Sequence, residues 1–177
     1  MKKTQSKAPE YLARERLALE AKLKEIKKRL PHLHGWPFYK WSREFFESKN
    51  KENFLTSGNQ LSKSSTAIRK CIHWATEKSL WPTLWPEYAR NDKSPNLFWY
   101  FYPDQKTLNA EFSTKWAEFL PKYTHKEHPV YGWKIIKNGT TRDVAGIAFN
   151  SGVTVYFKFY SQALIALQAS SVFALLS

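Results

Sequence analysis

Cysteine, acidic residues and long apolar runs are all scarce in this chain of 177 residues, and each scarcity excludes something. The single cysteine, Cys71, excludes an intramolecular disulfide and fits a reducing compartment. Its place beside Ile72 in a helical pattern favours a small buried residue over a nucleophile. The apolar run at 163–177 is too short to cross a bilayer as a helix, and the basic N-terminus lacks the apolar segment of a secretory signal. We therefore expect a cytoplasmic protein without a membrane partner.

Acidic residues number 15 against 28 Lys and Arg, which leaves a formal charge of +13. The excess is uneven, because residues 1–30 hold ten Lys and Arg against four Glu, whereas residues 159–177 hold no charge. A basic surplus of this size favours a polyanionic partner, with nucleic acid ahead of an acidic protein or a membrane surface.

The acidic residues include no adjacent pair. An ATPase uses such a pair, at the end of an apolar strand, to hold magnesium and to orient water. Metal ligands are also sparse: His125 and His128 have H-x-x-H spacing, but no set of Cys, Asp or Glu completes a zinc site. We predict no metal at these two histidines.

What the chain does contain predicts a basic helix at 1–34 and one α/β domain at 35–177. The helix, over 10–30, carries one apolar stripe and ends before Pro31. The stripe consists of Leu12, Leu19, Leu23, Ile26 and Leu30. We expect this stripe to pack on the domain and the opposite, charged face to lie in solvent. Direct contact of the charged face with DNA phosphates is the less favoured alternative.

An aromatic segment follows at 36–46, where Pro37 suits the first turn of a helix. Helical spacing places Phe38, Trp41 and Phe45 on one face. This cluster could stack an adenine ring next to a phosphate site, or it could belong to the core. Residue type alone favours the core, because aromatic side chains dominate core burial.

Residues 53–66 have the pattern of a short strand, a turn and the start of a helix that runs to about residue 78. The strand is Phe54 and Leu55, the turn begins at Gly58, and Ile68, Ile72 and Ala75 follow at helical spacing. Such a turn aims several backbone N–H groups and a helix N-terminus at one point, where a phosphate finds hydrogen bonds and positive potential. Lys63 would reach the outer phosphates, and the hydroxyl of Ser64 would hold magnesium.

Ser62 stands where the pattern G-x-x-x-x-G-K-[ST] has its second glycine. Positive φ at that position costs a serine free energy and brings a Cβ near the phosphate. The alternative to a phosphate loop is an ordinary strand-to-helix turn, with Ser62 as the N-cap and Lys63 in solvent.

Further elements complete an α/β pattern. We predict a loop anchored by aromatics at 81–95, a strand covered on both faces at 97–102, and a helix capped by Asp104 and ended by Pro121. The apolar face of that helix consists of Leu108, Phe112, Phe119 and Leu120, with Trp116 alongside it. A β-meander follows at 133–137, 144–149 and 153–160, then a short helix at 161–168 and a strand at 172–176.

This order of elements predicts a three-layer α/β fold of the P-loop NTPase type, with a mainly parallel sheet and the meander as an insertion. The fold is expected to be incomplete at the C-terminus, because the strand at 172–176 is the one best placed to carry a magnesium-binding acid and the sequence stops at Ser177.

As a set, these stretches resemble the N-terminal ATPase domain of the large terminase subunit, the motor that packages DNA into the heads of tailed phages. The similarity covers the chain from about residue 30. Residues 35–46 resemble the family's adenine-side segment, 58–65 its divergent phosphate loop, and 99–103 the strand that follows. Residues 153–162 resemble the stretch shortly before the family's magnesium-binding strand.

The resemblance implies ATP and Mg²⁺ as cofactors, double-stranded DNA as the substrate, and the portal and the small terminase subunit as partners, in a bacterial host cytoplasm. It implies an ATP-binding loop of Gly58, Asn59, Gln60, Leu61, Ser62, Lys63, Ser64 and Ser65. Within this loop Lys63 resembles the catalytic, phosphate-contacting lysine, and Ser64 the hydroxyl on magnesium. Phe38, Trp41 and Ser42 lie on the adenine side, where the family commonly has glutamine at the position of Ser42.

In the family, the strand at 172–176 would lead into Asp-Glu, and a nuclease domain would follow. We therefore expect a truncated ATP-binding portion of the motor, with weak ATP hydrolysis or none. Two alternatives stay open: a non-catalytic nucleic-acid-binding module that works through the basic N-terminal helix, and an inactive prophage remnant.

Overall fold

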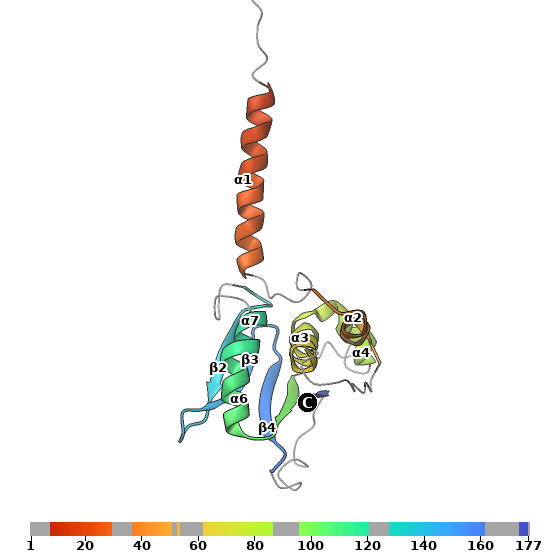
Figure 1. Cartoon of the computed structure of the whole chain (residues 1–177), viewed down its shortest axis with the longest axis vertical. Helices are drawn as coiled ribbons and strands as arrows, with labels where there is room; N and C mark the ends of the chain where they lie inside the picture. The colour runs from red at the N-terminus through yellow and green to blue at the C-terminus, as the bar shows by residue number, and fades with distance from the viewer. Residues whose placement is uncertain are drawn as a thin grey trace, which may run out of the picture.

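The computed structural model describes residues 8–29, 37–50, 53, 62–86, 96–120, 128–161 and 174–176, with the backbone alone described at 8–10, 26–29 and 174–176. The predicted N-terminal helix is confirmed as α1 (Ala8–Arg29). It stands away from the helices and the sheet that make up the rest of the structure (Figure 1). The strand at 54–55, the loop at 58–61 and the helix at 161–168 lie outside the described residues.

The sheet is mixed. Its strands are β1 (Leu97–Tyr102), β2 (Trp133–Lys137), β3 (Val144–Phe149), β4 (Thr154–Phe159) and β5 (Ala174–Leu176), in the order β2-β3-β4-β1-β5. β1 pairs in parallel with both β4 and β5, whereas β2, β3 and β4 form the predicted antiparallel meander. The expectation of a mainly parallel sheet is therefore too strong, because the meander joins its last strand to β1 and extends the same sheet.

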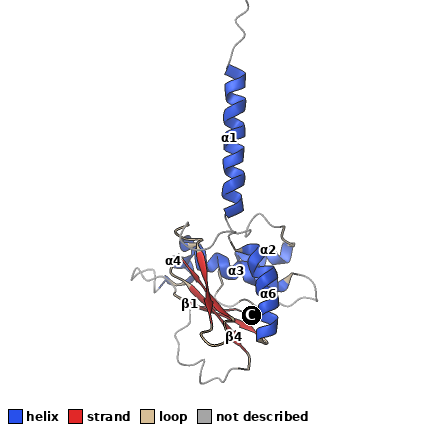
Figure 2. Ribbon diagram, turned by 90° about the vertical axis from the view of Figure 1, so that its left-hand side faces the viewer, coloured by secondary structure: helices blue, strands red, loops and turns tan. Residues whose placement is uncertain are grey.

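The helical elements are α2 (Lys40–Glu47), α3 (Lys63–Thr76), the 3₁₀ turn η1 (Lys78–Leu80), α4 (Trp81–Leu84), α6 (Gln105–Glu111), the π-helical turn η2 (Phe112–Trp116) and α7 (Ala117–Phe119). Of these, α2, α3 and α6 lie together on one side of β1 and β4 in Figure 2. The described part is thus a mixed α/β structure with α3 and the α6–α7 helix packed together.

Two sequence-based boundaries are wrong. Pro37 is not in the first turn of α2, because the helix begins at Lys40 after an extended Tyr39 with φ −65° and ψ 154°. The buried face of α2 is consequently Ser42 and Phe46 rather than the predicted aromatic face. The predicted loop at 81–95 begins with the short helix α4, whose first turn accommodates Pro82.

The core forms between β1 and the helices. Phe98, Tyr100 and Tyr102 alternate along β1 and join the buried cluster with Trp116. The ring of Trp116 lies edge-on to Tyr100, with centroids 5.4 Å apart, and to Phe157, at 5.2 Å. On the other face of β1, Trp99 is buried whereas Leu97 and Phe101 are half-buried, so the predicted cover of both faces is met in part. β1 is therefore the central element that the other parts pack around.

Two polar features at the carboxyl end of β1 fix the helix that follows. The carboxylate of Asp104 accepts a hydrogen bond of 2.7 Å from the backbone N–H of Thr107, which confirms the predicted cap and lowers the pKa of Asp104.

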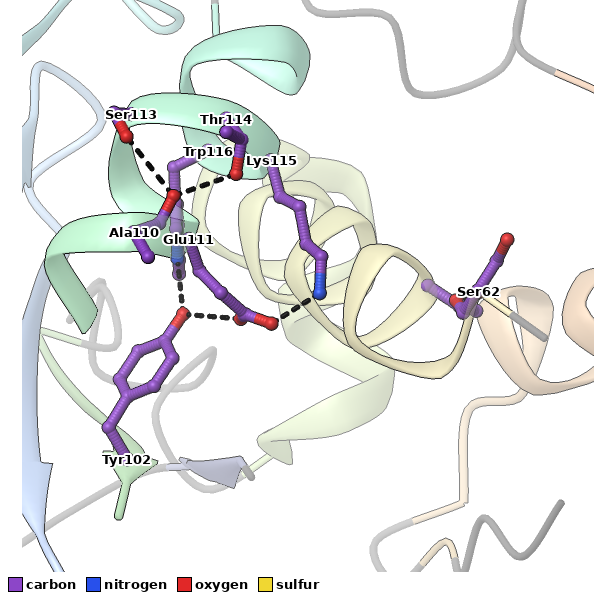
Figure 3. A network of polar contacts seen from close by, with 9 residues as sticks. Ser62, Tyr102, Ala110, Glu111, Ser113, Thr114, Lys115 and Trp116 are labelled. Carbon is purple, nitrogen blue, oxygen red and sulfur yellow. Dashed lines mark hydrogen bonds and ion pairs between the residues drawn. The ribbon is translucent and has the colours of Figure 1, made fainter. Parts of the chain in front are cut away.

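In the π-helical turn, the indole N–H of Trp116 donates to the hydroxyl of Tyr102 at 2.9 Å. That hydroxyl donates to Glu111 at 3.1 Å, and Glu111 also pairs with Lys115 (Figure 3). The polar atoms of two buried aromatic residues are thereby satisfied.

Candidate phosphate-binding site

The candidate site is built on the residue that precedes α3. Ser62 has a left-handed backbone conformation, with φ 60° and ψ 26°, and Figure 3 shows it at the start of the helix. Ser62 is the N-cap residue of α3, as the alternative of an ordinary turn predicts, but its side chain makes no capping hydrogen bond. The sequence indicated a positive φ at Ser62, because the phosphate-loop pattern has glycine at this position.

Hydrogen bonds to the Ser62 carbonyl hold this conformation. The oxygen accepts a bond of 2.9 Å from the backbone N–H of Thr66, which closes the first turn of α3, and a second bond of 2.9 Å from the Thr66 hydroxyl. A left-handed residue followed by helical ones turns successive N–H groups toward one side, and such a concavity binds anions. The backbone N–H groups of the first turn point out of the same helix end.

The structure places three predicted loop residues, Lys63, Ser64 and Ser65, in the first turn of α3, each half-buried. Gly58, Asn59, Gln60 and Leu61 lie outside the described residues. Of the predicted phosphate loop, the structure therefore describes Ser62 and the start of α3, where Lys63 and Ser64 occupy consecutive positions.

α2 is joined to α3 by a buried lysine that sequence reasoning did not single out. Lys70 of α3 is 1% exposed, and its ammonium donates to the carbonyls of Phe45 and, at 2.8 Å, Ser48. These two carbonyls lie at the C-terminal end of α2, where a cation also complements the helix dipole. The ammonium lies over the rings of Phe45 and Trp74 as well, at 4.7 and 4.8 Å. Lys70 therefore fixes the end of α2 on α3.

Arg69 holds the other end of the same segment. Its guanidinium lies 3.4 Å from the ring centroid of Phe38 and 5.4 Å from that of Phe119. Burial, and then the charge of Arg43, lower the pKa of Arg69 to about 10, so the group stays cationic at neutral pH. Phe38 also packs on Phe46 at 5.1 Å. Segment 37–48 is thus attached to α3 at both ends by neighbouring basic residues.

The three adenine-side candidates differ in what the fold leaves accessible. Phe38 is half-buried, with the Arg69 guanidinium over its ring. Ser42 is 2% exposed and donates its hydroxyl to the carbonyl of Tyr39 at 2.9 Å. Trp41 is half-buried and stacks on Tyr39 with centroids 6.3 Å apart. Phe38 and Trp41 therefore both keep part of their rings accessible, whereas Ser42 has a structural role inside α2.

Two other candidates from the sequence have structural roles. Cys71 is fully buried, as predicted, and burial raises the pKa of its thiol. The Nδ1 atom of His128 accepts hydrogen bonds from the backbone N–H groups of Val130 and Tyr131, at 3.2 and 2.9 Å. His128 therefore stabilises a turn, and His125 lies outside the described residues.

A search of the described ranges finds no cluster of three or more His, Cys, Asp or Glu that could hold a metal ion. In the same ranges, no helix combines the length and the apolar character needed to cross a bilayer.

Comparisons of the chain with protein-family models, with curated proteins and with solved structures find no match.

Proposed function

We propose that this chain is a nucleotide-binding portion of a terminase-type DNA-packaging motor, in which the start of α3 binds the phosphates of Mg-ATP. In this proposal the N–H groups around Ser62 and the ammonium of Lys63 meet the outer phosphates, and the Ser64 hydroxyl holds magnesium. The finer P-loop arrangement of the fold, with a helix layer on each face of the sheet, belongs to the same proposal.

The observation that carries the proposal is the left-handed conformation of Ser62 directly before Lys63. A serine with φ near 60° is disfavoured by about 1 kcal/mol or more, so an ordinary helix start would use an extended N-cap. The fold also places α3 in the same helix layer as α6, beside a sheet with parallel strands, which is the setting in which phosphate loops occur.

The first prediction concerns nucleotide affinity. We expect Mg-ATP to bind the purified chain, and Lys63→Ala to weaken binding by about 10- to 100-fold, because a hydrogen bond to a charged group contributes roughly 1.5–3 kcal/mol. Titration of a fluorescent ATP analogue measures both. Lys134→Ala, an exposed lysine on β2, is the control and should leave affinity unchanged.

Backbone geometry is tested in the same titration. Ser62→Val should weaken binding although Lys63 is intact, because a β-branched residue resists positive φ, whereas Ser62→Gly should keep it. Arg142 offers a matched control, because it has φ 64° in the turn between β2 and β3. Arg142→Val should reduce thermal stability without changing ATP affinity. Equal affinities for wild type, Lys63→Ala and Ser62→Val would refute the proposal.

A second candidate function, binding of double-stranded DNA by α1, is favoured by the exposure of its basic side chains. Arg14, Arg16, Lys22 and Lys24 are all exposed. The expected result is an affinity that falls steeply with salt and is indifferent to ATP and to Lys63→Ala. A double variant, Lys22→Gln with Lys24→Gln, should lower the slope of log affinity against log salt by roughly two. A slope that this variant leaves unchanged would place the DNA contacts elsewhere.

A further inference from the structure

The longest helix of the described structure packs against none of the other described elements. Every side chain described in α1, from Tyr11 to Glu25, is exposed. Leu12, Leu19 and Leu23 are 62%, 61% and 54% exposed. The expectation that this stripe packs on the domain is therefore not met within the described residues. A helix gains most of its stability in proteins by burying such a stripe.

The spacing of the stripe is that of a coiled coil. Leu12, Arg16, Leu19 and Leu23 follow one another at intervals of four, three and four, which are the a and d positions of a heptad. The sequence keeps the spacing at Ile26 and Leu30. Leu17 is just as exposed, at 65%, but it lies off this stripe. The stripe is narrow, as in a seam between two helices.

The charges of α1 favour one orientation of a second helix. Residues 10–20 hold three Glu against two Arg, whereas residues 21–29 hold five Lys and Arg against one Glu. A parallel pair would set the basic halves side by side and would place Arg16 against Arg16 of the second copy. An antiparallel pair sets each basic half along a more acidic half, and Arg16 keeps its bond of 2.9 Å to Glu20 of its own helix.

We propose that α1 forms an antiparallel coiled coil with α1 of a second copy of this chain. The centre of the pair lies near residue 21, so that Leu19 packs against Leu23 of the second copy and Leu12 lies far from its own equivalent. Lys22 and Lys24 stay at the surface. This proposal does not depend on nucleotide binding, because it uses residues of α1 alone.

Sedimentation velocity of the full chain over a concentration series tests the association. The wild type should be dimeric, and the double variant Leu19→Glu with Leu23→Glu should raise the dissociation constant at least about 100-fold, because it places four carboxylates in the seam. Leu17→Glu is the matched control, and should change the constant by less than about threefold. Far-UV circular dichroism verifies that both variants keep the domain folded.

Oxidation of the Leu12→Cys variant tests the relative orientation of the two α1 helices. The two introduced thiols lie close together only in a parallel pair. The native Cys71 is fully buried and does not interfere. An antiparallel dimer should show no intermolecular disulfide at Cys introduced at position 12, although sedimentation still detects the dimer. Rapid cross-linking would overturn the orientation. A monomer at all concentrations, a dimer that tolerates the glutamates, or association only after DNA is added would overturn the proposal.

Discussion

Lys70→Ala should destabilise the fold more than any other single truncation of a charged residue in the described part, by about 4 kcal/mol. The variant leaves the carbonyls of Phe45 and Ser48 without their buried donor, and it opens a cavity against the ring of Trp74. Urea unfolding followed by tryptophan fluorescence measures the loss. In a chain of this size it corresponds to a fall in Tm of roughly 10 °C.

Two companion variants separate the causes. Lys70→Met keeps the apolar stem between Phe45 and Trp74 but removes the donor, so about half of the loss should remain. Lys106→Ala removes an exposed lysine from α6 and should change stability by less than about 0.5 kcal/mol. If Lys70→Met were as stable as the wild type, the hydrogen bonds to the end of α2 would contribute nothing and the account of this lysine would be wrong.

The same lysine should make stability depend on pH. Burial lowers the pKa of Lys70 from 10.5 to about 8. Between these values the unfolded chain holds a proton that the folded chain has released, so the free energy of unfolding rises with pH. Burial raises the pKa of Tyr100 and Tyr102, which acts in the opposite direction above pH 10. The difference between wild type and Lys70→Met from pH 8 to 10 isolates the lysine.

The elements that local chemistry specifies could be predicted from the sequence. β1 has an unbroken run of β-favouring residues and was predicted at its observed bounds, and Asp104 caps the next helix because the cap needs only neighbouring residues. The start of α2 was misplaced because a proline suggested a first turn, whereas Tyr39 is extended and the ring of Phe38 packs on the guanidinium of Arg69 of α3.

The residues of the candidate site were likewise predictable only where neighbouring residues in the sequence specify them. The missing glycine marked Ser62 as a position of interest, and the structure gives it the left-handed conformation that glycine would take without strain. Arg69 and Lys70 gave no comparable signal, because adjacent basic residues in a helix usually lie in solvent. Their burial depends on segment 37–48, which lies more than twenty residues earlier in the chain, and no pattern within α3 reports that contact.

Gly146→Ala should destabilise the meander by at least about 2 kcal/mol. Gly146 lies in β3 opposite Tyr156 of β4, and a Cβ on it would be 2.5 Å from the backbone carbonyl of Val155. A backbone atom in a paired strand cannot move aside as a flexible side chain can, so β3 and β4 must separate locally. Because β4 also pairs with β1, the strain reaches the central strand. Thermal unfolding monitored by circular dichroism measures the loss.

Gly139 provides the control for this substitution, because it lies in the turn between β2 and β3 and no atom lies within 4 Å of a Cβ placed on it. Gly139→Ala adds the same methyl group to the same meander and restricts the unfolded chain to the same extent. Any difference between the two variants therefore reports the close approach of β3 to β4. Equal stability of the two variants would mean that the strands are not held at this spacing, and that the meander is loosely joined to β1.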